Sequence, residues 1–549
     1  MKRDLKKMAS EVLDILVIGG GVHGAAIAYH AAKAGYQVAL IEKNDFCSAT
    51  SANSLKILHG GLRYLQHLNI KRMRHSIVAR REMMQLAPHL VQPLPCVMPA
   101  YGHGLRGKKI MQTALFLNDC ISWDRNRGLA ADIRLPPGFT VSKKRCQEMI
   151  SAIQTEDLHG ASVWHDALAV DTERLVMTYL LEAADLGALA ANYAEATGVD
   201  KDRDGLYRVT FKDTFNQQVH TVKARFIINA AGPWLENLLT ATKISGTKSQ
   251  KWAMALNIIT RKKIFGEYAV ALEGNSSYED TDAIIKRGKR FYFFVPWRGY
   301  TMIGTDYQAS TANPDCLQIR REDIQTMIDD INDIYPPAKL QYEDISFYHA
   351  GLLPMTDTPE AGNNNVQLEK NSLFHEHDEK GFQGIFSVKG VKYTTAPHIA
   401  SEIVNLLRKR FLPAKTVEKK QHISDDGWQP VNQEIDRLLK KRYGRQAAQV
   451  HNYLHEEQNS EVWIDKTAGL LKAEVEYLIQ EEMACTMSDI VLRRTGLGTA
   501  ECPSKDILMK IAVLMAEILD WNDERKMKEI EDVFNQYSPL ILPHYAIEA

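Results

Sequence analysis

Residues 14–24 read Asp14-Ile-Leu-Val-Ile18-Gly19-Gly20-Gly21-Val22-His23-Gly24, an apolar strand that runs into a glycine-rich turn. An alanine-rich helix is predicted over residues 25–34, and a second strand over residues 37–41 ends at Glu42. Strand, glycine turn, helix, strand and acid in this order are typical of a dinucleotide-binding βαβ unit. The rest of the chain is interpreted outward from this unit.

Each glycine of the turn has a physical task. Gly19 allows the tight turn, Gly21 lets a pyrophosphate approach the backbone, and Gly24 lets the helix pack closely on the strand. The helix dipole then faces the phosphates. Glu42 stands where its carboxylate can accept hydrogen bonds from the hydroxyls of an unphosphorylated ribose. The fingerprint predicts bound FAD or NAD without choosing between them.

Size and composition indicate a folded enzyme with two or three domains. The 549 residues are 45% hydrophobic and 25% charged, which is ordinary for a globular protein. With 67 basic and 68 acidic residues, no global charge would attract nucleic acid. The cysteines are odd in number and form no C-x-x-C pair, so neither a disulfide framework nor a metal site is predicted; they are Cys47, Cys96, Cys120, Cys146, Cys316, Cys485 and Cys502.

No targeting or membrane-spanning segment is predicted. The basic N-terminus is not followed by a signal-peptide core, and no window reaches about 18 uninterrupted apolar residues. A cytoplasmic location fits these features. Peripheral contact with the inner face of the cytoplasmic membrane stays open for residues 63–89, which alternate basic and apolar side chains, although a solvated basic face over a buried apolar one explains the pattern more simply.

The middle of the chain alternates between two kinds of pattern. Residues 44–54 are polar and irregular and are expected to line the cofactor, whereas residues 100–160 predict mixed helix and loop. A helix is predicted over residues 172–186, and a central parallel strand is predicted from Arg225 to the Gly232-Pro233 break.

Between residues 250 and 350 the pattern changes to antiparallel strands. Residues 291–297 and 300–306 predict a hairpin whose turn is Arg298-Gly299, part of a substrate-binding sheet. From residue 425 onward charged helical periods dominate, and one helix is predicted over residues 473–494.

Several motifs outside the fingerprint identify a family resemblance. They are Leu58-His-Gly-Gly-Leu-Arg-Tyr-Leu65, Pro93-Leu-Pro95, Asn229-Ala-Ala-Gly-Pro-Trp234, Val295-Pro-Trp297, Gly304-Thr-Asp306, Lys392-Tyr-Thr-Thr395 and Asp489-Ile-Val-Leu-Arg-Arg-Thr495. Together with the fingerprint, they resemble FAD-dependent glycerol-3-phosphate dehydrogenases and their oxidase relatives over essentially the whole chain. The resemblance selects FAD over NAD.

The resemblance implies an α/β fold: a glutathione-reductase-type FAD-binding Rossmann-like domain, an antiparallel β-rich substrate domain and a C-terminal α-helical domain. The oxidoreductase region is expected over residues 1–420 and the helical cap over residues 421–549. Within the first region the FAD-binding segments are expected at residues 11–95, 160–245 and 350–410, and the substrate segments at residues 96–159 and 246–349.

The implied reaction is oxidation of sn-glycerol 3-phosphate to dihydroxyacetone phosphate, with hydride transfer to flavin N5 and onward transfer of electrons to a quinone, O₂ or another acceptor. His59 is the predicted proton acceptor, with His349 as a second candidate in the substrate pocket. Arg63 and Tyr64 are predicted to bind the phosphate, and Lys392 to stabilise charge on the reduced flavin. Arg63 and Lys392 thus count as both catalytic and substrate-binding.

The residues expected to contact FAD come from every FAD-binding segment. They are Gly19, Gly21, Gly24, Glu42, Lys43, Thr50, Ser51, Ser54, Leu58, Gly60, Gly61, Ala231, Gly232, Trp234, Gly351, Gly390 and Thr394. A homodimer is compatible with the sequence.

One departure from the family pattern bears on the substrate. Where the family has Gly-x-Arg-Pro, this chain has Gly351-Leu352-Leu353-Pro354, so a phosphate-binding cation is replaced by Leu353. Loss of one charged hydrogen bond costs about 1.5–3 kcal/mol. Two alternatives therefore stay open: the same flavin chemistry on another polyol phosphate or an unphosphorylated hydroxy compound, and a catalytically degraded FAD-binding protein.

Overall fold

The computed structural model describes residues 1–102, 108–241, 250–277, 289–356, 366–378, 382–413, 432–454 and 462–540. Within these ranges, the side chains of residues 63, 66, 241, 275–277 and 289 are not described. The chain forms two compact units, each assembled from separated segments. Unit 1 comprises residues 1–52, 171–250 and 370–537, and unit 2 comprises residues 53–170, 251–369 and 538–549.

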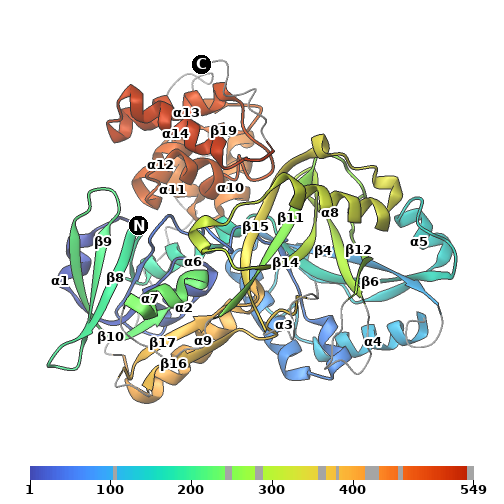
Figure 1. Ribbon diagram of the computed structural model, residues 1–549, viewed down its shortest axis with the longest axis horizontal. Helices are drawn as coiled ribbons and strands as arrows, with labels where there is room; N and C mark the ends of the chain where they lie inside the picture. The colour runs from blue at the N-terminus through green and yellow to red at the C-terminus, as the bar shows by residue number, and fades with distance from the viewer. Residues whose placement is uncertain are drawn as a thin grey trace. The chain divides into compact units, whose positions relative to one another are not determined.

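Unit 1 contains the predicted nucleotide fold (Figure 1). Its sheet runs in the order β16-β17-β10-β1-β2-β7, in which β17, β10, β1, β2 and β7 are parallel. The strands are β1 Val12–Ile18, β2 Val38–Ile41, β7 Leu189–Ala191, β8 Ala194–Lys201, β9 Tyr207–Asp213, β10 Val219–Asn229, β16 Leu373–Glu376 and β17 Ile385–Lys389. The central strand predicted from Arg225 is confirmed as the end of β10, although β10 begins earlier, at Val219, and ends at Asn229, before the Gly232-Pro233 break.

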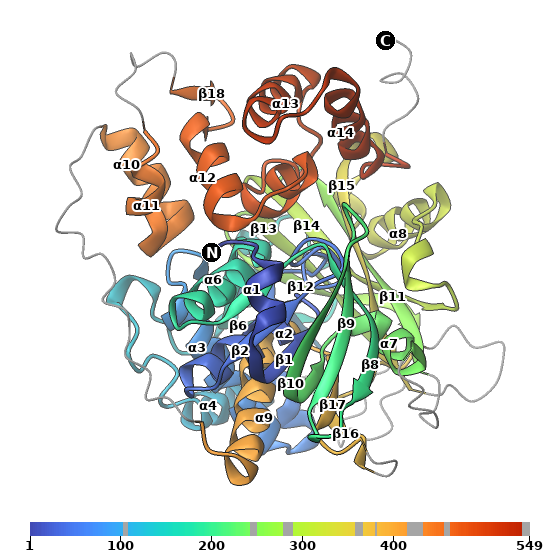
Figure 2. The same ribbon diagram turned by 90° about the vertical axis from the view of Figure 1, so that its left-hand side faces the viewer.

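Helices cover this sheet, and α2 packs against both α6 and α9 (Figure 2). The helices of the nucleotide fold are α1 Leu5–Ser10, α2 Val22–Lys33, α6 Thr172–Asp185, α7 Leu235–Ala241 and α9 Ala396–Arg410, with the 3-10 turns η4 Gly232–Trp234 and η9 Tyr393–Thr395. The helix predicted over residues 172–186 is confirmed within one residue. Residues 44–54 contain neither helix nor strand, as their composition predicts.

Unit 2 is built on a mainly antiparallel sheet in the order β15-β11-β14-β13-β12-β4-β6-β3, with β5 paired to β6. Its strands are β3 Ile57–Leu58, β4 Val91–Tyr101, β5 Phe139–Ser142, β6 Leu158–Ala169, β11 Lys251–Thr260, β12 Ala269–Ser277, β13 Lys289–Trp297, β14 Tyr300–Ser310 and β15 Ile345–Met355. The predicted hairpin at Arg298-Gly299 is confirmed, and both turn residues have positive φ, at 51° and 87°.

The helices of unit 2 flank this sheet. They are η1 Leu62–His67, α3 Ile70–Leu86, α4 Lys108–Ile121, η3 Ala131–Ile133, α5 Lys143–Met149, η5 Pro314–Cys316, α8 Arg321–Ile334, η6 Pro336–Ala338 and η7 Tyr342–Asp344. No helix in the described ranges is both long and apolar enough to cross a membrane.

The prediction of mixed helix and loop over residues 100–160 is confirmed for α4, η3 and α5, but it omits the short strand β5 and the first residues of β6. The prolines that precede this stretch belong to a strand. Pro93, Pro95 and Pro99 lie within β4, two or four residues apart. Residues at such spacing direct their backbone nitrogens to the same side, so the missing N–H groups do not interrupt the ladder on the other side. That ladder pairs β4 with β6 along its whole length.

The boundaries of the compact units differ from the expected segments at several places, of which the longest are residues 53–95, residues 350–369 and the C-terminal helices. Residues 53–95 group with unit 2, because β3 and β4 both pair with β6. The C-terminal helices group with unit 1. Their elements are α10 Gln433–Tyr443, η11 Gly444–Gln446, α11 Ala447–His451, β18 Trp463–Asp465, β19 Leu470–Leu471, α12 Lys472–Glu482, the π-helical turn η12 Asp489–Arg494, α13 Lys505–Leu519 and α14 Asp523–Asn535.

The single helix predicted over residues 473–494 is wrong. Helix α12 ends at Glu482, because Met483 adopts the left-handed conformation with φ of 57°. The chain re-enters a helical turn only at Asp489, in η12. The apolar periodicity continued through this break, so it concealed a change of direction that backbone conformation imposes.

A buried carboxylate, Asp45, attaches the C-terminal helices to the nucleotide fold. It receives two hydrogen bonds from Arg494, at 2.7 and 2.8 Å, and one from Arg493 at 2.8 Å. Asn192 adds a fourth at 2.9 Å. Asp45 and Arg494 have no exposed side-chain surface, so each compensates a charge that would otherwise be buried alone.

Replacement of Asp45 by alanine is expected to destabilise unit 1 by about 3–5 kcal/mol, because two arginines lose their buried partner. Differential scanning calorimetry would measure this as a fall of roughly 6 °C or more in melting temperature. Glu148→Gln is the control, since it removes an exposed partner of Arg145 and should leave the melting temperature unchanged. A parental melting temperature for Asp45→Ala would contradict the role of this cluster.

Candidate functional site

The glycine turn holds the start of α2 against the end of β1. Gly19 has φ of +111°, and a Cβ there would lie 2.5 Å from the carbonyl oxygen of Ala230. A Cβ on Gly24 would lie only 1.9 Å from the carbonyl oxygen of Gly19. No side chain fits at either position, so the fingerprint glycines are demanded by the backbone itself.

The N-terminus of α2 is suited to an anion. Its N-cap is Gly21, which has no side chain to cap the first turn. The Val22 N–H donates to Ser51 Oγ at 3.0 Å, so the predicted residue Ser51 lies beside this turn. The backbone amides of an uncapped helix start and the helix dipole both favour a phosphate group.

Glu42 is fixed by the backbone at the opposite side of the turn. Its Oε2 accepts from the Gly20 N–H at 2.6 Å and its Oε1 from the Asn44 N–H at 2.9 Å. Burial raises the pKa of Glu42, and these two N–H groups act in the opposite direction. A carboxylate can accept further hydrogen bonds, so Glu42 keeps the capacity for a ribose.

The loop before α9 packs on the fingerprint helix. A Cβ on Gly390 would lie 2.6 Å from Cε1 of His23, the fifth residue of the turn. Burial lowers the pKa of His23 to about 4, so this imidazole is neutral at pH 7. Unit 1 therefore brings together two predicted FAD-binding segments that lie more than 360 residues apart in the chain.

The predicted helix start after Lys392 is present as η9 followed by α9. Part of its backbone is already engaged, because the Val391 and Lys392 N–H groups donate to Ser372 Oγ at 3.0 and 3.4 Å. The Lys392 side chain is exposed and Thr394 is buried.

The remaining predicted residues of unit 1 surround the same strand ends. The Lys43 ammonium lies 4.1 Å from the centroid of the Trp234 ring, a cation–π contact. Gly232 begins η4 with φ of +53°, and Ala231 donates to Asn229 Oδ1 at 3.2 Å. In all, unit 1 holds Gly19, Gly21, Gly24, Glu42, Lys43, Thr50, Ser51, Ala231, Gly232, Trp234, Gly390, Lys392 and Thr394.

Unit 2 holds the other predicted residues: Ser54, Leu58, His59, Gly60, Gly61, Arg63, Tyr64, His349 and Gly351. Leu58 is buried in β3, and Tyr64 is half-buried in η1. The backbone of Arg63 belongs to η1, but its side chain lies outside the described residues.

The paired glycines after His59 have structural partners within their own unit. A Cβ on Gly60 would lie 2.5 Å from Nη1 of Arg80, and one on Gly61 would lie 2.7 Å from the ring of Tyr64. Gly61 also has φ of +90°. The packing of Arg80 and Tyr64 is sufficient to require both glycines.

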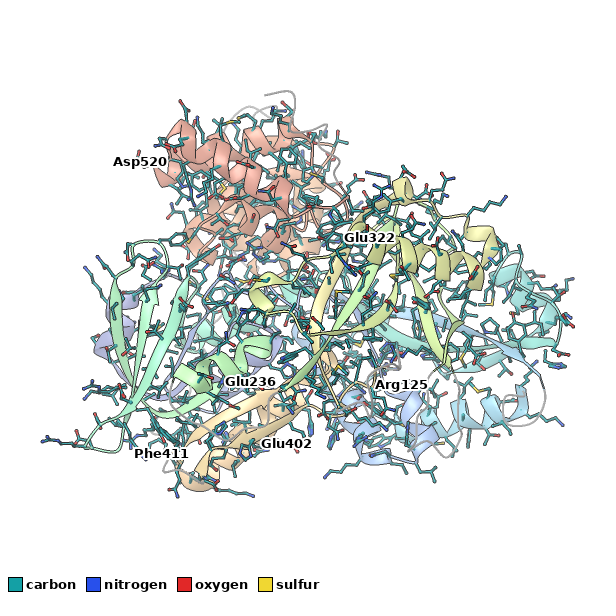
Figure 3. All side chains as sticks on the ribbon, viewed as in Figure 1. Arg125, Glu236, Glu322, Glu402, Phe411 and Asp520 are labelled. Carbon is teal, nitrogen blue, oxygen red and sulfur yellow. The ribbon has the colours of Figure 1, made fainter. Side chains whose placement is uncertain are left out.

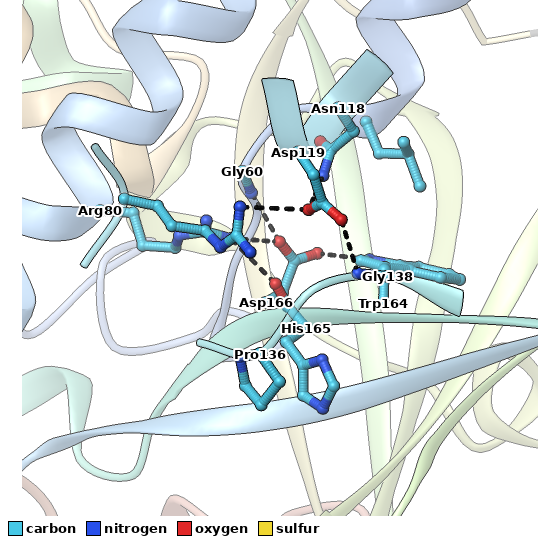
Figure 4. Close-up of a pocket in the computed structure, with 11 residues that line it drawn as sticks. Gly60, Arg80, Asn118, Asp119, Pro136, Gly138, Trp164, His165 and Asp166 are labelled. Carbon is cyan, nitrogen blue, oxygen red and sulfur yellow. Dashed lines mark hydrogen bonds and ion pairs between the residues drawn. The ribbon is translucent and has the colours of Figure 1, made fainter. Parts of the chain in front are cut away.

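The His59 side chain contacts the buried carboxylate of Asp166, a residue that the sequence did not indicate. Its Nδ1 lies 3.0 Å from Oδ2 of Asp166, and its ring packs on Phe293 with centroids 5.4 Å apart. Asp166 also accepts from the buried Arg80, as the close-up in Figure 4 shows. The imidazole itself is 46% exposed, so its remaining nitrogen can meet a ligand.

Asp166 is ionised despite its burial. Burial would raise its pKa, but the hydrogen bond and charge of His59, the charge of Arg80 and the N–H of Gly60 hold the pKa well below its ordinary range. Asp119, near the end of α4, lines the same pocket (Figure 4). Its carboxylate pairs at 3.1 Å with Arg125, which follows α4 and is labelled in Figure 3.

His349 lies in the interior of unit 2. It is 2% exposed, its Nδ1 lies 3.4 Å from the Ser54 carbonyl oxygen, and the ring of Trp297 packs on it with centroids 5.9 Å apart. It occupies the same face of β15 as Gly351 and Leu353, since alternate residues of a strand share a face. The leucine that replaces the family arginine thus shares a strand face with a predicted site histidine.

The missed residues had one visible signal. Asp166 is a lone acid within β6, a strand whose residues are buried on both faces, and an acid in such a setting is rarely buried without a partner.

The βαβ fingerprint, the parallel sheet and the separate antiparallel sheet define a flavoprotein-type oxidoreductase. A family model described as FAD dependent oxidoreductase matches residues 14–406, so the chain belongs to that family. A second model, the C-terminal domain of alpha-glycerophosphate oxidase, matches residues 401–526. The predicted fold class and the FAD cofactor are confirmed.

Two curated relatives match over nearly their full length. The chain is 27% identical to the glycerol-3-phosphate dehydrogenase of Synechocystis, covering 99% of this chain and 100% of the relative. It is also 27% identical to the aerobic glycerol-3-phosphate dehydrogenase of Staphylococcus aureus, with 97% and 96% covered.

Solved structures share the fold. The glycerol-3-phosphate dehydrogenase of Bacillus halodurans, complexed with FAD, superposes with a TM-score of 0.72 at 22% identity and 98% coverage of both chains. The L-alpha-glycerophosphate oxidase of Mycoplasma pneumoniae, with FAD bound, gives 0.52 at 18% identity, covering 75% of this chain and 97% of that one.

The residues of unit 1 fit FAD. The glycine turn leaves backbone space that any Cβ would fill, and the N-cap of α2 has no side chain, so both features suit the pyrophosphate. Glu42 suits the ribose.

Gly24→Ala is expected to abolish FAD retention, because the new Cβ would collide with a backbone carbonyl at the phosphate turn. The ratio of absorbance at 450 nm to that at 280 nm, measured on purified protein, reports the FAD content. Gly198→Ala is the matched control in unit 1, since nothing lies within 4 Å of its new Cβ. Equal FAD content in both variants would refute the assignment of this turn.

Proposed function

We propose that this protein oxidises sn-glycerol 3-phosphate to dihydroxyacetone phosphate. The observation that carries the proposal is the His59–Asp166 pair at the start of the His59-Gly-Gly-Leu-Arg-Tyr64 motif, in a chain whose full length aligns with glycerol-3-phosphate dehydrogenases. An exposed imidazole backed by a buried carboxylate is suited to accept a proton.

When bound, FAD supplies a two-electron acceptor that takes a hydride at N5. His59 accepts the proton from the substrate hydroxyl, so the O–H bond breaks as an N–H bond forms. The hydride leaves the carbinol carbon, and that carbon becomes a ketone. Lys392, at the start of η9 and α9, is positioned by its place in the chain to favour negative charge on the reduced cofactor.

Arg63 and Tyr64 bind the substrate phosphate in this proposal. They follow His59 by four and five residues, within η1, so the anion site and the base share one short segment. Arginine is the residue best suited to bidentate phosphate recognition. The electrons then pass to a quinone or another acceptor.

Leu353 favours a second candidate substrate. It is half-buried in β15 where the related motif has arginine, so this part of the pocket carries less positive charge. A longer polyol phosphate or an unphosphorylated hydroxy compound would then be the substrate, with the flavin chemistry unchanged.

Turnover with an artificial electron acceptor separates these substrates. Saturable activity with glycerol 3-phosphate and none with glycerol is the expected result. Arg63→Ala should raise KM for glycerol 3-phosphate by roughly 10- to 150-fold, the loss of one charged hydrogen bond to phosphate.

Lys71→Ala removes a nearby exposed cation on α3 and serves as the control, with an unchanged KM. Preference for glycerol or for a longer polyol phosphate would overturn the choice of substrate, and an unaltered KM in Arg63→Ala would refute the phosphate role.

We further propose peripheral contact with an anionic membrane through unit 2. Large apolar side chains on or just after η1, α3 and α4 are exposed, among them Phe116 at 67% and Trp123 at 75%, and Leu68, Ile70 and Leu117 accompany them. Helix α4 contacts η1, and Lys71, Lys108 and Lys109 lie on the same elements. Exposed apolar side chains on elements that also carry lysines suit an anionic lipid surface.

Co-sedimentation with phosphatidylglycerol vesicles tests this surface. The double variant Phe116→Ser with Trp123→Ser should bind at least about 10-fold more weakly, because two large side chains no longer enter the lipid. Val219→Ser, which removes an exposed apolar residue of unit 1, should bind like the parent protein. Absence of parental binding would rule the surface out.

A further inference from the structure

Asp166 receives four hydrogen bonds, and they are sorted between its two oxygens. The Gly60 N–H and Arg80 Nη1 donate to Oδ1, at 2.7 and 2.6 Å. Trp164 Nε1 donates to Oδ2 at 3.0 Å, and His59 Nδ1 lies at the same distance from Oδ2. The carboxylate is 4% exposed, so no solvent competes for these positions.

This arrangement determines which nitrogen of His59 carries a proton. An ionised carboxylate offers only acceptors, so the His59 Nδ1 must donate. In the neutral imidazole the other nitrogen, Nε2, is then unprotonated and can accept a proton. The structure thus specifies the tautomer that a base at this position requires.

The imidazole ring of His59 also needs a hydrogen-bond partner to hold its orientation. Almost half of the His59 side chain is exposed, so burial does not fix its rotamer. Its described contacts are the edge of Phe293 and the carboxylate of Asp166. Asp166 is itself immobilised by Arg80, whose guanidinium occupies the space that a side chain on residue 60 would fill.

We propose that Asp166 is a positioning residue that holds His59 in the Nδ1–H tautomer, with Nε2 directed to receive the hydroxyl proton of the substrate. This inference rests on the proposed function for the identity of that substrate. Arg80 and Trp164 complete the device, because each supplies a donor that keeps the carboxylate in one orientation.

Asp166→Asn tests the positioning role, because the donors around the side chain determine which way the amide of asparagine is turned. Gly60 and Arg80 supply donors, so the amide oxygen of asparagine should remain on their side. The amide NH₂ then faces His59, whose Nδ1 must become an acceptor, and also Trp164 Nε1, which loses its acceptor, a smaller cost than turning the NH₂ toward the charged Arg80 and the Gly60 N–H. The proton moves to Nε2, and the base is lost while the ring keeps its place.

The first measurement is the ¹⁵N spectrum of histidine side chains in the FAD-bound protein, with His59 assigned by comparison with His59→Gln. In the neutral form of the ring, the parent protein should show a protonated Nδ1 and an unprotonated Nε2, and Asp166→Asn the reverse. A parent spectrum with the proton on Nε2 would overturn the proposal, whether or not any variant folds.

The second measurement is the limiting rate of flavin reduction by glycerol 3-phosphate. Asp166→Asn should reduce this rate by about 10²- to 10⁴-fold, the range seen when a catalytic base loses its function or its orienting carboxylate. The dissociation constant for the substrate should change by less than about 3-fold, since the phosphate site is untouched. An unchanged rate would overturn the positioning role.

Asp124→Asn is the matched control. Asp124 is a buried carboxylate of the same unit that pairs with Arg74 and Arg81 instead of His59. An equal loss of rate in Asp124→Asn would show that Asp166 acts only on stability. If glycerol 3-phosphate fails to reduce even the parent protein, the proposed function fails, while the ¹⁵N spectrum still decides the tautomer.

Discussion

The contact between Gly24 and the carbonyl group of Gly19 sets the geometry on which unit 1 depends. With no side chain between them, α2 starts directly against the end of β1, and its first amides face the strand ends. Glu42 reaches back to the same turn through Gly20, and Gly390 packs on His23 from a distant part of the chain. The close approach of Gly24 to Gly19 therefore brings three segments together around the expected phosphate and ribose positions: the glycine turn, the end of β2 at Glu42 and the loop at Gly390.

Each unit contains a buried carboxylate that is stabilised by ion pairs, but the two carboxylates differ in the role of their partners. Asp45 is matched by Arg493 and Arg494, and all its partners are structural. Asp166 is matched by one arginine and one partly exposed histidine. A buried ion must be paired to persist. When one of the partners is an imidazole at the surface, the same pairing also determines where a proton can be accepted.

Much of the fold could be predicted from the sequence because it follows local patterns. The residue types alone indicate the geometry of the fingerprint at residues 14–24, of the strand that begins at Arg225 and of the turn at Arg298-Gly299. The motifs also pointed to His59, although its role stays a prediction.

What could not be predicted depends on partners that are distant in the chain. The proposed role of Asp166 depends on its contacts with Arg80 and His59, which lie 86 and 107 residues away in the chain. The break at Met483 depends on one left-handed residue inside an otherwise continuous apolar period. Strand pairing across a sheet leaves little trace in local periodicity, so the sequence did not indicate β6. A single residue with positive φ leaves no trace in it either, so the end of α12 was not predicted.

The most direct test of the account is anaerobic stopped-flow absorbance near 450 nm on the FAD-bound protein, mixed with glycerol 3-phosphate at increasing concentration. The account predicts saturable bleaching of the flavin, since His59, Arg63 and Lys392 would together suffice despite Leu353. A flavin that stays oxidised at every concentration would contradict glycerol 3-phosphate oxidation by this protein.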